Sequence, residues 1–166
     1  MSDPAPRWLS EEEMAAWLPL VRLLGLLPQA LDRQLREEAG ISHVYYQLLA
    51  LLSAEPDDAL RMSKLARRSG TSVSRLSHAV SSLESRGWVE RLPAPGDGRG
   101  QLARLTGAGR AQLAAVAPGH VAEVRRRVFD RLPPEDVAHL RRLADALVQG
   151  LQATGPRPLP GAASPP

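Results

Sequence analysis

The chain has 166 residues, no cysteine, and 21 basic against 18 acidic side chains. The lack of cysteine excludes a disulfide framework, a thiolate zinc site and a thiol that senses oxidants. No uninterrupted apolar run approaches the ~20 residues that a membrane helix needs. The polar N-terminus does not resemble a signal peptide, so we expect a cytoplasmic protein with no membrane partner.

The charges are distributed unevenly along the chain. Residues 1–58 carry 4 basic and 10 acidic side chains, residues 59–106 carry 9 and 3, and residues 107–166 carry 8 and 5. A small net charge therefore conceals a basic middle segment, which is typical of a surface that binds a polyanion such as nucleic acid. The alternative is that these arginines form an ordinary solvated surface.

A long amphipathic helix is predicted near the N-terminus. Residues 1–9 show no pattern and are expected to be irregular. Ser10 followed by Glu13 forms a capping box, and apolar residues then recur every three or four positions for about seven turns. Gly40 is expected to end the helix, which is therefore predicted over residues 10–39.

The middle of the chain contains several short elements, each bounded by turn residues. A helix capped by Ser42 comes first. It is followed by a strand at 60–62, a helix at 64–69 and a helix at 73–86. Ser63 and Ser72 are the expected N-caps of the last two helices, and Gly70 is expected to make the turn between them.

After Gly87 the apolar period changes from helical spacing to two. Residues 88–105 are predicted to form a β-hairpin whose charged loop covers residues 93–100. This hairpin resembles a wing placed after two short helices.

The C-terminal part is again predicted to be helical. Thr106 is expected to cap a helix that Pro118 and Gly119 interrupt, so that either two helices meet there or one bends sharply. A last helix is expected from residue 135 to 153. The proline-rich residues 154–166 are predicted to be disordered.

The order of these elements predicts a mainly α fold with a small β-wing. Residues 42–106 are predicted to form a winged helix-turn-helix DNA-binding domain, with its recognition helix at 73–86 and its wing at 88–105. The helices at 10–39 and 107–153 carry more apolar surface than so small a domain could cover. We therefore expect them to form a helical dimerisation region with a second chain.

The polar face of the predicted recognition helix suits entry into the major groove. Its side chains are slim or hydrogen-bonding, and Arg75 lies in the first turn, where a guanidinium can bind guanine O6 and N7. Serine hydroxyls at helix N-termini are suited to phosphate. The candidate DNA contacts from these helices are Ser63, Lys64, Ser72, Ser74, Arg75, Ser77 and His78. The alternative, a face that is merely solvated, is our interpretation for Ser82 and Ser85.

At this point the sequence resembles the multiple antibiotic resistance regulator (MarR) family of bacterial transcription factors. The resemblance rests on residues 61–110, and its pieces are the run LExRGxV at 83–89, Asp97-Gly98-Arg99, Leu105-Thr106 and Gly109. The runs SRLSH at 74–78 and PGHVAEVRRRVFD at 118–130 resemble an actinobacterial branch of the family.

The resemblance implies a homodimer that reads palindromic DNA as a transcriptional regulator, most often a repressor. Its dimerisation region would contain the helices at 10–39, 107–130 and 135–153. The resemblance also implies that the wing residue Arg99 enters the minor groove and that Asp97 braces basic residues. These roles are expectations taken from the family.

The family further implies a small aromatic or amphipathic effector that releases DNA. Trp17, His43, Tyr45 and Tyr46 are candidates to line its pocket, although core packing is the favoured interpretation of each of them taken singly. Tyr45 and Tyr46 are adjacent on a helix, so at most one should face a common pocket. His43 and His120 could approach each other in a dimer, but a shared site there is not expected. The four histidines are scattered, so we expect no metal and no cofactor.

The sequence also bears on two other classes of function, an enzyme and a protein-binding module. The glycines between 96 and 100 lack the following helix that a phosphate-binding loop requires, and no catalytic set has a recognisable context, so an enzyme is not expected. A winged-helix module that mediates only protein–protein interaction remains the alternative. Replacing Arg75 with alanine distinguishes it, because such a module would lose no DNA affinity.

Overall fold

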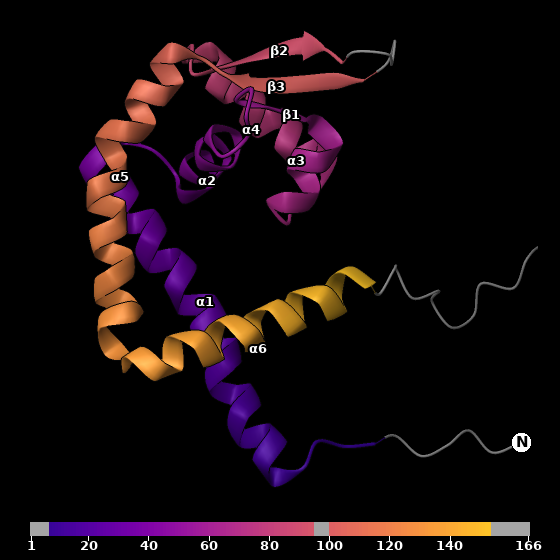
Figure 1. Cartoon of the computed structure of the whole chain (residues 1–166), viewed down its shortest axis with the longest axis vertical. Helices are drawn as coiled ribbons and strands as arrows, with labels where there is room; N and C mark the ends of the chain where they lie inside the picture. Colours follow the sequence, from indigo (N-terminus) through magenta and orange to yellow (C-terminus); the bar gives the residue numbers. More distant parts are fainter. Residues whose placement is uncertain (1–6, 95–99, 154–166) are drawn as a thin grey trace, which may run out of the picture. The chain divides into compact units, whose positions relative to one another are not determined.

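The structure is a computed structural model that describes residues 7–94 and 100–153, in two compact units that meet between Val124 and Arg125. The first unit contains most of the elements (Figure 1). They are α1 (Glu11–Ala39), α2 (His43–Ser53), β1 (Ala59–Arg61), α3 (Met62–Arg68), α4 (Val73–Ser85), β2 (Val89–Pro93), β3 (Gln101–Leu105) and the greater part of α5 (Gly107–Arg127). The mainly α fold with a small β-wing is confirmed.

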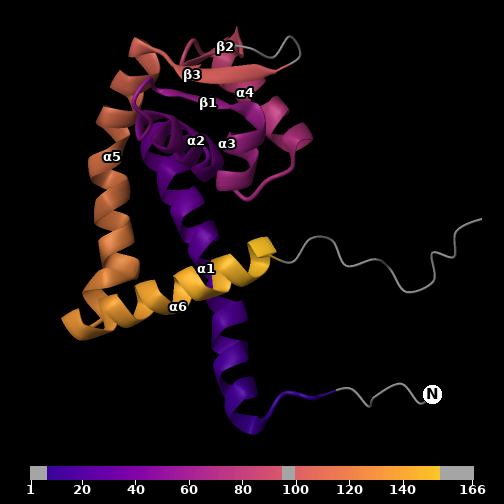
Figure 2. The ribbon, with the colours of Figure 1, turned by 45° about the vertical axis from the view of Figure 1, so that its right-hand side comes forward.

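The three strands form one antiparallel sheet in the order β1-β3-β2. The hairpin pairs Val89 with Leu105 and Pro93 with Gln101, and the predicted short strand joins its other edge by pairing Leu60 with Ala103. Figures 1 and 2 show α2, α3 and α4 grouped beside this sheet.

The core of the first unit lies between these helices and the sheet. Leucines from α2 pack with apolar residues from every neighbouring element, and the most deeply buried are Leu48, Leu49, Leu52, Leu65, Leu76, Val80, Leu83 and Ala103. Each helix contributes only one face, so the opposite faces of α3 and α4 remain available to solvent.

The local signals at the ends of α1, α2 and α4 are confirmed. Ser10 and Glu13 form the capping box, the Ser42 hydroxyl accepts from the Tyr45 amide, and the Ser72 hydroxyl accepts from the Arg75 amide. These caps satisfy amide groups that the first turn of a helix leaves without partners.

The prediction that Ser63 caps the third helix is wrong. The helix begins two residues earlier than predicted, at Met62, with Arg61 at the N-cap and no side-chain capping bond. Pairing of β1 continues through Arg61, and Met62 is needed in the core. The strand therefore passes directly into the helix and leaves no room for a separate cap.

Of the two alternatives at Pro118 and Gly119, the meeting of two helices is wrong, because α5 continues through both residues. Gly119 does not end the helix but lies where α5 is close to α1, since a Cβ at position 119 would lie 2.5 Å from Glu38 Oε2. The missing side chain lets the C-terminal part of α1 approach α5 closely.

The second unit contains a 3-10 turn at Phe129–Arg131 and α6 at Pro134–Ala153. None of the residues of α6 is buried. Leu140, Leu143 and Leu147 form an apolar row at helical spacing, with exposed fractions of 38%, 52% and 55%. The predicted disordered tail at 154–166 lies outside the described residues.

Most of α1 is likewise uncovered. Only Leu31, Gln34 and Leu35 of its 29 residues are buried. An 18-residue window of α1 has a mean hydropathy of 1.4, so by length and composition this helix could cross a membrane. Arg22 interrupts the apolar residues of α1, so no uninterrupted apolar run is long, but the helix as a whole carries few charges over this window.

Candidate nucleic-acid interface

The helix-turn-helix is formed by α3, a tight turn and α4. Gly70 has a φ of 65°, in the left-handed region that favours glycine, and the Thr71 amide donates to the carbonyl of Ala66. The Ser72 hydroxyl then accepts from the Arg75 amide at 3.3 Å and starts α4. This turn holds the N-terminus of α4 at the surface.

The two faces of α4 differ sharply. Leu76, Val80 and Leu83 are fully buried in the core. On the other side Ser74, Arg75 and His78 are exposed and lie within the first two turns. The packing of the apolar face therefore presents a guanidinium and an imidazole together at the start of the helix.

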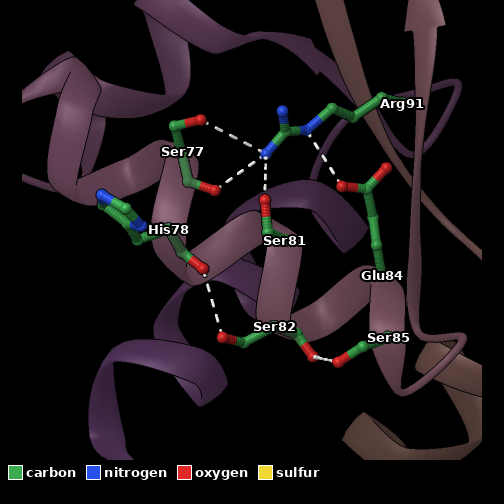
Figure 3. A network of polar contacts seen from close by, with 7 residues as sticks. All are labelled: Ser77, His78, Ser81, Ser82, Glu84, Ser85 and Arg91. Atoms are coloured by element: carbon green, nitrogen blue, oxygen red, sulfur yellow. Dashed lines mark hydrogen bonds and ion pairs between the residues drawn. The ribbon is translucent and has the colours of Figure 1, made fainter.

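Ser77 is placed differently from the sequence prediction. It is half-buried, and both its carbonyl and its hydroxyl accept hydrogen bonds from Arg91 Nη2, at 2.8 and 3.4 Å (Figure 3). Sequence reasoning did not single out Arg91. A signal was present, because Arg91 lies two residues after the buried Val89 and therefore on the covered face of β2.

Lys64 and Ser63 are exposed on α3, but the charge of Lys64 is partly balanced. Glu55 lies 3.4 Å from Lys64 Nζ and also accepts a short hydrogen bond from Arg68. The Arg68 hydrogen bond, together with the charges of Lys64 and Arg68, holds the pKa of Glu55 below its ordinary value. A phosphate that approached Lys64 would therefore compete with an acceptor already in place.

The wing strands carry charge outside the core. Arg104 on β3 pairs with Glu90 on β2 at 2.8 Å, and both side chains are exposed. The predicted wing contacts Asp97 and Arg99 lie outside the described residues. The strands show where the loop that carries these residues begins and returns.

The four candidates for an effector pocket do not come together. Trp17 is 49% exposed on α1, and Tyr45 faces Arg86, whose guanidinium carbon lies 5.8 Å from its ring centre. A cavity of about 260 Å³ between α1 and α5 is lined by Glu38, Ala39, Gln112, Ala115, Val116 and Gly119, and by none of the four candidates.

Instead His43 and Tyr46 meet His120 of α5, a group that we call the histidine cluster. The His120 ring centre lies 4.1 Å from that of Tyr46 and 5.6 Å from that of His43. The sequence suggested an approach of His43 and His120 in a dimer, and the structure instead brings both together within one chain. Sequence spacing could not show this, since the chain folds back between α2 and α5.

The histidine cluster is polar but incompletely satisfied. The buried Nδ1 of His120 has no hydrogen-bond partner in the part of the chain that is described. Burial lowers the pKa of His43 and of His120, and the neighbouring His43 lowers that of His120 further. Asp32 and Glu123 act weakly in the opposite direction. Burial also raises the pKa of Tyr46.

We expect the folded state to lose stability as the pH falls below about 6.5. A lowered histidine pKa means that the unfolded chain, with its ordinary value near 6.5, binds the proton first. The free energy of unfolding should then fall by at most about 1.4 kcal/mol per pH unit for each histidine, until the folded-state pKa values are passed. Urea unfolding at pH 7.5, 6.5 and 5.5 measures this slope.

The matched variant for this prediction is His120→Gln, which keeps a polar side chain and removes the titration. Its unfolding free energy should depend less on pH than that of the parent between 7.5 and 5.5. The carboxylates with lowered pKa, Asp32 and Glu55, protonate below this window. Equal slopes for variant and parent would show that His120 does not titrate during unfolding.

Over residues 7–94 and 100–153, no group of three or more histidine, aspartate or glutamate side chains is arranged to hold a metal ion. The described residues therefore offer an exposed polar face of α4 and a separate polar cluster between α2 and α5.

Comparison with known proteins gives a consistent result. A model described as the MarR family matches residues 39–100. Sco3205, a MarR family transcriptional regulator from Streptomyces coelicolor solved in complex with DNA, is 47% identical and covers 90% of this chain and 94% of its own, with a TM-score of 0.84. AbsC, another MarR family regulator of that organism, is 36% identical over 90% of this chain and all of its own, with a TM-score of 0.83.

A curated relative outside the actinobacteria also matches. The multiple antibiotic resistance protein MarR of Escherichia coli is 33% identical over 95 residues, which make up 57% of this chain and 66% of that protein. The relatives are transcriptional regulators, not enzymes.

Proposed function

Because the chain belongs to the MarR family of transcriptional regulators, we propose that it acts as a homodimer that represses transcription from a palindromic operator. The observation that carries this proposal is the exposed start of α4, where Arg75 and His78 stand beside each other on a helix fixed by its apolar face. The DNA complex of Sco3205, at 47% identity, supports it.

In this proposal α4 lies in the major groove. Arg75 binds a guanine through its two-pronged guanidinium, and His78 contacts the adjacent base edge. Ser72 and Ser74 at the helix start, with Ser63 and Lys64 on α3, contact phosphates. Arg99 enters the minor groove and Asp97 braces it. Ser77 is left out because its polar atoms face Arg91.

The dimer is supported by uncovered apolar surface. Residues 17–27 of α1 are apolar on nearly every side, and such a helix is ordinarily buried. Leu18 and Leu24 are nevertheless 61% and 63% exposed. We propose that a second copy of this chain covers α1 and the apolar row of α6, and that its two-fold symmetry matches two half-sites.

The competing explanation, that α1 crosses a membrane, is less well supported. Sco3205 was solved with DNA and matches 90% of this chain. The remaining tenth, about 17 residues, is shorter than the 29 residues of α1. Part of α1 therefore has a counterpart in a DNA-bound regulator.

We propose that a small aromatic or amphipathic effector binds at the histidine cluster and favours a half-site spacing that does not match DNA. The support is its position, between α2 of the winged domain and α5, and its unpartnered Nδ1 of His120. An imidazole nitrogen without a partner can donate a hydrogen bond to a ligand or accept one from it, depending on the tautomer of the ring. A ligand that binds more tightly to the dimer with the mismatched half-site spacing would lower the affinity of the dimer for DNA.

Arg75→Ala tests the assignment of α4. We expect a loss of about 1–3 kcal/mol in affinity for the operator and relaxed selection at one base pair per half-site. A gel-shift titration on the DNA upstream of the protein's own gene, at fixed salt, measures the first effect. Sequencing of selected duplexes measures the second.

Arg33→Ala is the matched control, because Arg33 is an exposed arginine of α1 outside the winged domain. It should bind like the parent. If Arg75→Ala also binds like the parent, α4 does not read DNA and the protein-binding alternative is favoured.

A further inference from the structure

We propose that Arg91 is a positioning residue for DNA recognition, which fixes the orientation of α4 from the wing strand β2. This inference depends on the proposed function, because it concerns how α4 is held while it reads DNA. Arg91 itself is not proposed to touch DNA.

The guanidinium of Arg91 binds α4 over two turns (Figure 3). Its Nη2 donates to the Ser77 carbonyl at 2.8 Å and to the Ser81 hydroxyl at 2.9 Å, and its Nε lies 3.0 Å from Glu84 Oε2. Positions 77, 81 and 84 share one face of a helix. One side chain of the wing therefore holds the whole length of that face.

Arginine suits this position better than lysine. Its planar group carries several nitrogens in a fixed geometry, so Nη2 can donate to a carbonyl and a hydroxyl while Nε forms an ion pair with a carboxylate, without the alignment of a hydrogen bond. The side chain is 23% exposed and that of Glu84 is 31% exposed, so water screens these contacts only partly. A lysine ammonium on a flexible stem could keep the charge but not the set of directions.

The hydrogen bonds of Arg91 matter because the remaining contacts of α4 with the core are apolar and have little directional preference. Leu76, Val80 and Leu83 bury the apolar face of α4, and this packing resists removal of the helix. A rotation or slide of a few tenths of an ångström changes the buried area little, but it moves Arg75 relative to a base edge. Bonds from a fixed donor fork restrain that movement.

Arg91 also joins the two parts that are proposed to meet DNA. It lies opposite Ala103 in the β2–β3 ladder, on the strand that leads to the wing loop. A second set of contacts on α4, from the Ser82 hydroxyl to the His78 carbonyl and from the Ser85 hydroxyl to the Ser82 carbonyl, stays within the helix. Among the contacts drawn in Figure 3, those of Arg91 link α4 to the wing.

The test uses Arg91→Lys, which retains the charge and removes the fork. Affinities for the operator and for a scrambled duplex of equal length are measured on the full-length protein over a range of salt concentrations. We expect operator affinity to fall about tenfold, the scrambled duplex to be bound within about twofold of the parent, and the salt slope to stay unchanged. Base preference should relax at all positions under α4, not at one.

Two milder variants distinguish a loss of positioning from a loss of folding. Ser81→Ala removes one bond and should lower the operator-to-scrambled ratio by a smaller factor at an unchanged melting temperature. Ser85→Ala removes a hydroxyl whose bond stays within α4, and it should bind like the parent.

Three results would overturn the inference. Arg91→Lys could bind the operator with the parent's ratio and base preferences. Arg91→Lys or Arg91→Gln could lose affinity for both duplexes equally with a smaller salt slope, which would indicate a direct phosphate contact. Ser81→Ala could leave the ratio unchanged. If the parent itself does not prefer the operator over the scrambled duplex, the proposed function fails instead.

Discussion

Leu24→Glu is expected to convert the proposed dimer to a single chain and to abolish tight operator binding. Leu24 is 63% exposed in the isolated chain, so the substitution should change the folding of one chain little. In a dimer the carboxylate would be buried without a partner, at a cost of several kcal/mol. A protein that binds one half-site at a time loses the contacts of the second half-site. We expect operator affinity to fall at least about 100-fold, which corresponds to about 2.8 kcal/mol.

Sedimentation velocity at low micromolar concentration measures the first effect, because one chain has a mass of 18.0 kDa and a dimer twice that mass. A titration of the full operator and of an isolated half-site measures the second. Gln29→Glu is the control, since it adds the same charge to α1 at a residue that is already polar. A parent protein that sediments as 18.0 kDa would contradict the dimer.

Gly109→Ala is expected to destabilise the winged domain severely. A Cβ at this position would collide with the Trp88 carbonyl oxygen and come within 2.8 Å of Leu105 Cδ1. The first obstacle is backbone, and it already accepts from the Thr106 amide at 3.0 Å, so it cannot move aside cheaply. We expect a loss of about 3 kcal/mol or more in unfolding free energy and a fall in melting temperature of about 10 °C.

The same substitution should weaken DNA binding, because Trp88 immediately precedes wing strand β2. Calorimetry and operator titration below the melting temperature separate the two effects. Gly107→Ala is the matched control in the same helical turn, where a Cβ meets nothing within 4 Å. It should change stability by less than about 1 kcal/mol and on the favourable side. Similar losses for both variants would show that the close approach at Gly109 is not what matters.

The helix and strand positions followed from the sequence where the cause is local. Caps at Ser10, Ser42 and Ser72 depend on residues three positions away, and helix and strand periods depend on the next few apolar residues. The family resemblance also located α4 and the wing. The error at Ser63 arose because the demands of β1 and the core outweighed a good local cap.

The proposed site was only partly predictable for the same reason. Exposure of Arg75 and His78 follows from the apolar spacing of α4, since residues opposite a buried row face outward. Asp97 and Arg99, named by resemblance, lie outside the described residues and stay predictions. The pairing of Lys64 with Glu55 and the inward turn of Ser77 depend on neighbours from other elements.

By itself the sequence determined the elements, their order and which face of α4 is exposed, because hydrogen bonding and apolar periodicity within a few residues decide these features. Tertiary structure alone decided that His43 meets His120, that Arg91 holds Ser77 and Ser81, and that a Cβ at Gly109 would strike Trp88. These residues are brought together by packing of separate elements. The geometry of that packing depends on the whole core, and no short stretch of sequence contains it.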